Sequence, residues 1–220
     1  MSYVPPTPEY DWEDLAQNRP GDSLRRAGDE RRKAAPAKSL IGRLFGVKSG
    51  DKAFRIGAEG EEAVGAKLDS LGLGFYTLHS VPVGNNNSDL DHLVVGPKGV
   101  VVVNTKNHPG GKITVGEKVI WVNGDASDYL RNSRYEAKRA SGILSKACGF
   151  EVKVRPIIVV ANGDLTFRGN SRPKDVEVLG IRDVIKRLRA GRTVLDINAV
   201  SHIFGVARRS TTWQPKTRNS

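Results

Sequence analysis

The chain has 220 residues, enough for one packed domain with additional tails. Its 35 Lys and Arg residues exceed its 24 Asp and Glu residues, and the resulting net charge of +11 favours a polyanionic partner, first nucleic acid and second an anionic membrane surface. No apolar run approaches the roughly 18 residues of a spanning helix, so stable membrane insertion is not expected, and the single cysteine, Cys148, excludes an internal disulfide.

The two ends of the chain have the composition of unfolded segments. Residues 1–18 are acidic and proline-rich, and residues 19–52 carry an excess of Lys and Arg interrupted by Pro and Gly. Such stretches bury too little apolar surface to order themselves. We therefore predict a disordered charged arm over residues 1–52, a domain over residues 53–207 and a flexible basic tail over residues 208–220. The N-terminus lacks a signal-peptide pattern, which together with the lone thiol favours the cytoplasm.

Apolar periodicity predicts alternating helices and strands within the domain. Helices are expected at residues 57–71, 129–147, 181–190 and 196–204. Strands are expected at residues 74–83, 90–95, 100–106, 112–115, 118–122, 152–160 and 176–179. This order predicts an α/β (α+β) fold, a mixed β-sheet flanked by helices, and it excludes a helical bundle and a β-sandwich.

The first predicted hairpin gathers polar residues at the end of an apolar face. A tight turn over residues 96–99 places Asp91 opposite Asn104. Because side chains alternate along a strand, Lys106 points to the same side as Asn104. Burying an acid, an amide and a lysine beside an apolar strand face costs free energy unless these groups interact with one another or with a ligand. The alternative is a purely structural ion pair between Asp91 and Lys106.

The helix predicted at residues 57–71 contributes a second acid. Glu61 precedes Val64 by three positions and lies on the apolar stripe of this helix, whereas Glu59 and Glu62 lie off it. Acids in a first helical turn also interact favourably with the helix dipole, and this explains Glu59 and Glu62. It does not explain an acid on the apolar stripe, so we expect Glu61 to point inward.

Several segments together form a recognisable pattern: residues 57–61, 91–100, 104–107 and 111–113, followed by Trp121 and the helix around residues 130–139. In this pattern the chain resembles the nuclease-related domain (NERD) family over roughly residues 54–165. The resemblance implies the restriction-endonuclease-like fold of the PD-(D/E)xK nuclease superfamily.

The resemblance also implies roles for the polar cluster. Asp91 corresponds to the metal-binding acid, position 104 to the second acid, Lys106 to the lysine and Glu61 to the helix acid. Mg²⁺ or Mn²⁺ is then the implied cofactor, with Asp91, Asn104 and Glu61 as its ligands. The chain departs from the family at Asn104, where Glu is usual, and an amide oxygen can ligate Mg²⁺ without supplying charge.

The implied activity is Mg²⁺-dependent hydrolysis of phosphodiester bonds in DNA. The neutral side chain at position 104 leaves an alternative open, a catalytically degenerate module that binds nucleic acid or another partner. No base-reading motif is present, so little sequence preference is expected. The expected phosphate-contacting residues are Lys112, Arg131, Arg134, Lys138 and Arg139.

Overall fold

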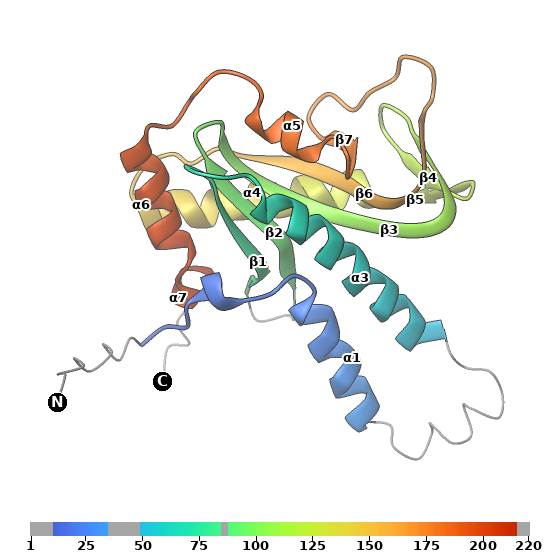
Figure 1. The fold of residues 1–220 in the computed structure, drawn as a ribbon, viewed down its shortest axis with the longest axis horizontal. Coiled ribbons are helices and arrows are strands. Elements are labelled where there is room, and N and C mark those ends of the chain that lie inside the picture. The colour runs from blue at the N-terminus through green and yellow to red at the C-terminus, as the bar shows by residue number, and fades with distance from the viewer. Residues whose placement is uncertain (1–10, 35–48, 85–87, 215–220) are drawn as a thin grey trace.

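The structure, a computed structural model, describes residues 11–34, 49–84 and 88–214, with the backbone alone for residues 30–34 and 49–52. Its elements in chain order are η1 (Leu15–Gln17), α1 (Asp22–Ala34), α3 (Ser49–Asp69), β1 (Tyr76–Pro82), β2 (Asp89–Gly96), β3 (Gly99–Val115), β4 (Ile120–Val122), β5 (Asp125–Ser127), α4 (Tyr129–Cys148), β6 (Val154–Phe167), β7 (Glu177–Gly180), α5 (Val184–Arg189), α6 (Ile197–Ala207) and α7 (Ser210–Trp213). Figure 1 shows the strands between helices.

A seven-stranded mixed sheet forms the centre of the fold. Strands β1, β2 and β3 are antiparallel neighbours, while β6 runs parallel to β3 and β7 runs parallel to β6. The far half of β3 also pairs with β4, which pairs with β5. The predicted mixed sheet flanked by helices is confirmed, and so is the hairpin register, because Val95 pairs with Val100.

Alternation along β2 and β3 divides the apolar side chains between two layers. On one face, α3 and α5 cover a cluster that includes Val64, Leu68, Val94, Val101, Val103, Ile157 and Val159. On the other face, α4, α6 and α7 cover a cluster that includes Leu93, Val95, Val100, Val102, Leu144 and Ile203. The strands are therefore buried on both sides, and helices α3 and α4 approach the sheet from opposite faces.

The N-terminal segment differs from the prediction of a disordered arm. Residues 11–34 include η1 and α1, and Leu15 is 2% exposed within the core. Asp14 caps η1 and forms an ion pair with Arg208, near the opposite end of the chain. These partners are distant in sequence, so local composition gave no sign of them. The other residues of the predicted arm either lie outside the described ranges, at 1–10 and 35–48, or form the first turn of α3.

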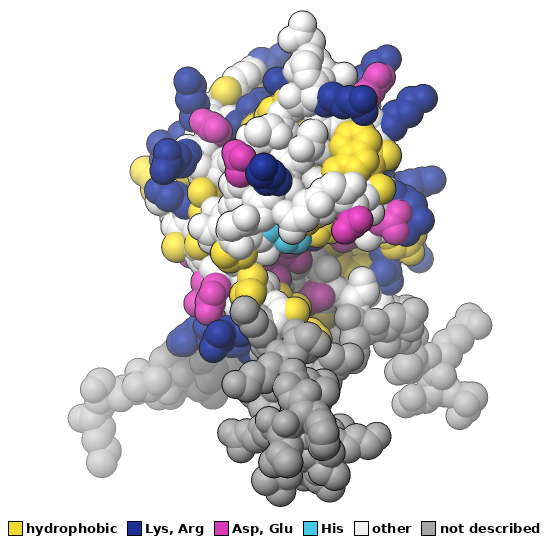
Figure 2. All heavy atoms as spheres, turned by 90° about the vertical axis from the view of Figure 1, so that its right-hand side faces the viewer, with side chains coloured by type: hydrophobic (Ala, Val, Ile, Leu, Met, Phe, Trp, Pro, Cys, Tyr) yellow, Lys and Arg dark blue, Asp and Glu magenta, His cyan; other side chains and the backbone are white. Residues whose placement is uncertain are grey.

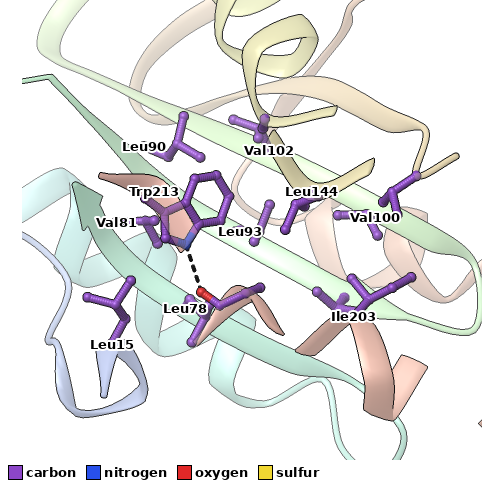
Figure 3. Close-up of a cluster of buried hydrophobic side chains, with 14 of the residues drawn as sticks. Leu15, Leu78, Val81, Leu90, Leu93, Val100, Val102, Leu144, Ile203 and Trp213 are labelled. Carbon is purple, nitrogen blue, oxygen red and sulfur yellow. Dashed lines mark hydrogen bonds between the residues drawn. The ribbon is translucent and has the colours of Figure 1, made fainter. Parts of the chain in front are cut away.

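The C-terminal segment also differs from the predicted flexible tail. Helix α7 follows Arg208, and the indole of Trp213 is 2% exposed. Its N–H donates a 2.7 Å hydrogen bond to the carbonyl of Ala207, as Figure 3 shows among the surrounding apolar side chains. Residues 215–220 lie outside the described part of the chain.

Replacing Trp213 with alanine is expected to destabilise the protein by about 3–5 kcal/mol, the usual cost of emptying a large buried aromatic site. Urea denaturation measures this change in the free energy of unfolding. Tyr135→Ala is the control, because Tyr135 is 64% exposed. A loss for Trp213→Ala as small as that of the control would show that α7 does not anchor the core.

Several element boundaries differ from those predicted. Strand β3 continues through Pro109 and Gly110, where a break was expected, although its register with β6 shifts between Lys106 and Lys112. Helix α3 begins at Ser49, earlier than predicted, and β5 was not predicted. Within the described ranges, no helix is both long and apolar enough to cross a membrane.

Candidate active site

The candidate site lies where one side of β3 changes partner strands. Strand β2 pairs with β3 as far as Val103, and β4 begins to pair with it at Ile113. Between these points the backbone of β3 must find other hydrogen-bond partners. The Thr105 N–H donates a 2.6 Å hydrogen bond to Oδ2 of Asp91, so a carboxylate takes the place of a strand carbonyl. The gap thus brings the Asp91 side chain to the exposed edge of β3.

A cleft of about 710 Å³ opens at this edge. Its polar lining includes Glu61, Asp91, Thr105 and Lys106, and its apolar lining includes Leu24 and Phe54. Figure 2 shows acidic side chains set back in a hollow on this side of the molecule, with Lys and Arg side chains around it. The cleft therefore has acidic side chains at its base and Lys and Arg side chains around part of its rim.

Helix α3 carries Glu61 to the cleft, as its sequence pattern predicted. Glu61 is 5% exposed, whereas Glu59 is exposed and pairs with Arg55, and Glu62 is half-buried and pairs with Arg25. The prediction that Glu61 alone points inward is confirmed.

Close packing fixes the turn of α3 that carries Glu61. A Cβ atom on Gly60 would lie 2.5 Å from Cβ of Asn107 on β3, so only glycine permits this approach. Asn107 also donates a 2.5 Å hydrogen bond to the carbonyl of Ile56. Both contacts lie within five residues of Glu61 on the same helix and hold it at the edge of β3.

Asn104 lies at the gap and contacts a further acid, Glu136, on α4. Its Nδ2 donates a 2.7 Å hydrogen bond to Oε2 of Glu136 on α4. The Asn104 side chain is 6% exposed, and its Oδ1 has no hydrogen-bond partner among the described residues. Oε2 of Glu61 and Oδ2 of Asp89 are likewise buried without a partner there.

Two acids of the cluster, Asp89 and Glu136, could have been found by the arguments that found Asp91 and Glu61. Asp89 precedes Asp91 by two positions and shares its side of the strand, but the predicted strand began one residue too late to include it. Glu136 precedes Ala140 by four positions, beside the apolar stripe of α4.

Burial and mutual repulsion disfavour the charged forms of these acids. Burial, followed by repulsion from the charges of Asp91 and Asp89, raises the pKa of Glu61 to about 9. Burial also raises the pKa of Asp91, although the Lys106 ammonium and the Thr105 N–H oppose that shift. The cluster therefore holds protons near neutral pH when no cation is present.

Glu136 belongs to the same electrostatic cluster. Burial raises its pKa to about 7, the Asn104 hydrogen bond lowers it, and the charge of Asp91 raises it. Four carboxyl groups, those of Glu61, Asp89, Asp91 and Glu136, thus interact near one ammonium, that of Lys106. Such an excess of acid is a favourable setting for a cation.

Replacing Glu61 with glutamine is expected to stabilise the cation-free protein at pH 8 by roughly 2 kcal/mol or more, since one pKa unit corresponds to about 1.4 kcal/mol. In the wild type, the stability contributed by protonated Glu61 is complete below its ordinary pKa of 4.5 and is lost as the pH rises through about 9. Urea denaturation in EDTA at pH 5 and pH 8 measures this loss.

Glu59→Gln is the matched control for this prediction, since Glu59 lies two positions away on the same helix and is exposed. It should leave the pH dependence of stability unchanged. Equal pH dependence in Glu61→Gln and the wild type would show that the pKa of Glu61 is not raised in the folded protein.

The histidines are placed differently around the site. His92 points away from Asp91, its neighbour on β2, because side chains alternate along a strand, and its buried ring is hydrogen-bonded to His79 and to the Thr105 hydroxyl. Burial lowers the pKa of His92 well below its ordinary value, so it is neutral. His108 lies on the cleft side and is hydrogen-bonded to the hydroxyl of Tyr129, whose ring centroid lies 4.9 Å from Nζ of Lys106.

The residues expected to contact phosphate lie on β3 and α4, at positions away from the acid cluster. Lys112 is exposed on β3, and the others are on α4. Arg131 is paired with Asp128, and Arg134 makes two hydrogen bonds to Asp175. Lys138 and Arg139 line a shallow groove on the outer side of α4. The structure thus does not bring these five side chains to the acid cluster, and two of them already have acidic partners.

The donor groups of the site fit Mg²⁺ in chemical type. This hard cation takes carboxylate, amide and backbone oxygens, and three buried oxygens of the cluster have no hydrogen-bond partner among the described residues. No group of three or more His, Cys, Asp or Glu side chains in the described ranges is spaced to hold a metal ion. A cation would therefore need the amide oxygen of Asn104 in addition to carboxylates.

Comparison with known protein families identifies a match over the middle of the chain. Residues 56–161, from α3 into β6, match the family NERD, described as the nuclease-related domain. No curated protein and no solved structure matches the chain. The matched range contains Glu61, Asp91, Asn104 and Lys106, and also Asp89 and Glu136.

Proposed function

We propose that the protein is a Mg²⁺-dependent nuclease that hydrolyses phosphodiester bonds of DNA, because its residues 56–161 match the nuclease-related domain family. The observation that carries the proposal is the set of buried, unpartnered oxygens on Glu61, Asp89 and Asn104 around the Asp91 carboxylate. Buried oxygens without donors are costly, and a bound cation would satisfy them.

The proposed ligands of the cation are Asp91, Glu61 and Oδ1 of Asn104. When bound, Mg²⁺ or Mn²⁺ would lower the pKa of a coordinated water and polarise the scissile phosphate. The Thr105 N–H keeps Asp91 oriented through its 2.6 Å hydrogen bond. Lys106 would position the attacking water or stabilise the negative charge that develops on the phosphate.

DNA binding is proposed to be electrostatic and largely independent of sequence. Lys112, Lys138 and Arg139 would contact phosphates from outside the cleft, and their affinity would fall as the salt concentration rises. Arg131 and Arg134 would first have to exchange Asp128 and Asp175 for phosphate. The net charge of +11 supports this mode of binding.

The test is cleavage of supercoiled plasmid and linear duplex DNA by the full chain in Mg²⁺, in Mn²⁺ and in EDTA. We expect cleavage with either cation and none in EDTA. Cleavage that persists in EDTA, or that is absent with both cations, would contradict the proposal.

A second candidate function is a module that binds nucleic acid without cutting it. Asn104 favours it, because a neutral ligand in place of an acid weakens cation binding. DNA binding that is sensitive to salt, with no cleavage under any of these conditions, would support this second function.

A further inference from the structure

The carboxylate of Glu136 lies behind the one proposed ligand that lacks a charge. Glu136 reaches the site from α4, on the face of the sheet opposite α3, and accepts a 2.7 Å hydrogen bond from Nδ2 of Asn104. Above its pKa of about 7, Glu136 is ionised and only accepts hydrogen bonds, so at such pH this contact fixes which end of the Asn104 amide is nitrogen. The oxygen of that amide must then point away from Glu136.

The orientation of the amide has a consequence inside the cluster. Oδ1 of Asn104 is buried and has no partner among the described residues, and its side chain is more than nine-tenths buried. Without Glu136 the amide could rotate and present its NH₂ group to the other acids of the cluster. An NH₂ group there would hydrogen-bond a carboxylate and would repel a cation.

We propose that Glu136 is a positioning residue, which holds the Asn104 amide with its oxygen towards the cation and restores to the site the negative charge that Asn104 lacks. This inference rests on the proposed function, since it assumes that the cluster binds a cation. Asn104 and Glu136 act together as a neutral ligand backed by a carboxylate. Together the two side chains supply the oxygen ligand and the negative charge that a single carboxylate at position 104 would supply.

The test is Mn²⁺ binding to the full chain without DNA, measured by isothermal titration. Glu136→Gln is expected to raise the Mn²⁺ dissociation constant about 10- to 100-fold, as is usual when a residue behind a metal ligand is lost. The glutamine oxygen can still accept the hydrogen bond from Asn104. A purely structural role would therefore leave Mn²⁺ affinity unchanged, and that result would overturn the inference.

A reciprocal exchange sharpens the test. Asn104→Glu alone places two carboxylates within hydrogen-bonding distance, so it should not recover the full benefit of the added charge. The double variant Asn104→Glu/Glu136→Gln restores an amide–carboxylate pair with reversed polarity. We expect it to bind Mn²⁺ at least as tightly as the wild type, and much more tightly than Glu136→Gln. A double variant that binds no better than Glu136→Gln would contradict the inference.

The control is Glu117→Gln, because Glu117 is an exposed acid near Lys174, outside the cluster. It should bind Mn²⁺ as the wild type does. Wild-type protein that binds no Mn²⁺ would overturn both this inference and the proposed function. Wild-type binding with unchanged affinity in Glu136→Gln would overturn this inference alone.

Discussion

Replacement of Asp91 with asparagine is expected to reduce Mg²⁺-dependent DNA cleavage on the order of 1000-fold, equivalent to about 4 kcal/mol in the activation free energy. Asp91 is the proposed ligand on the β2–β3 hairpin. Its charge repels that of Glu61 and is attracted by the ammonium of Lys106. An asparagine oxygen can still accept the Thr105 N–H, so the local backbone should be retained. The loss would then report the missing charge and not a disrupted strand.

The rate of plasmid nicking under single-turnover conditions measures this effect. Asp125→Asn, in an exposed position on β5, is the matched control and should cleave at the wild-type rate. Mn²⁺ titration should show a parallel loss of affinity in Asp91→Asn. Cleavage at a rate near that of the wild type would remove Asp91 from the proposed site.

Replacement of Lys106 with methionine is expected to reduce the cleavage rate about 100- to 1000-fold, the range seen when one preorganised electrostatic contact is removed. Lys106 lines the cleft beside Asp91, and its charge lowers the pKa of the nearby acids. Removing a positive neighbour should leave Mn²⁺ affinity unchanged or increase it. The two variants therefore differ: Asp91→Asn loses binding and turnover together, and Lys106→Met loses turnover alone.

The same single-turnover assay and Mn²⁺ titration separate these outcomes. Lys118→Met, at an exposed turn position, is the control for a lost positive charge. A fall in Mn²⁺ affinity in Lys106→Met equal to that in Asp91→Asn would show that Lys106 supports the cation site and not the reaction.

The hairpin and the inward acid could be predicted because both depend on local periodicity. A short turn fixes the register of β2 and β3, and continuing this register one position past the pair His92 and Val103 sets Asp91 across from Asn104. Glu61 stands out because it occupies an apolar position of a regular helix. Neither inference needs a partner that is distant in the sequence.

The parts that were missed depend on distant contacts or on irregular backbone. Leu15 and Trp213 are buried against elements far away in the chain, so their segments read as unstructured tails. The continuation of β3 past Lys106 involves a shift of register with β6, which interrupts the strand pattern. The contact between Glu136 and Asn104 requires the placement of α4 over the sheet, which periodicity alone does not specify.

The most direct measurement is a crystal of the full chain soaked in Mn²⁺, with an anomalous difference map calculated at the manganese edge. We predict a peak at the edge of β3, bounded by the carboxylates of Asp91 and Glu61 and by Oδ1 of Asn104. A well-ordered cluster with no peak there, or with Oδ1 of Asn104 hydrogen-bonded to a protonated carboxyl group in the presence of Mn²⁺, would contradict a cation-dependent site.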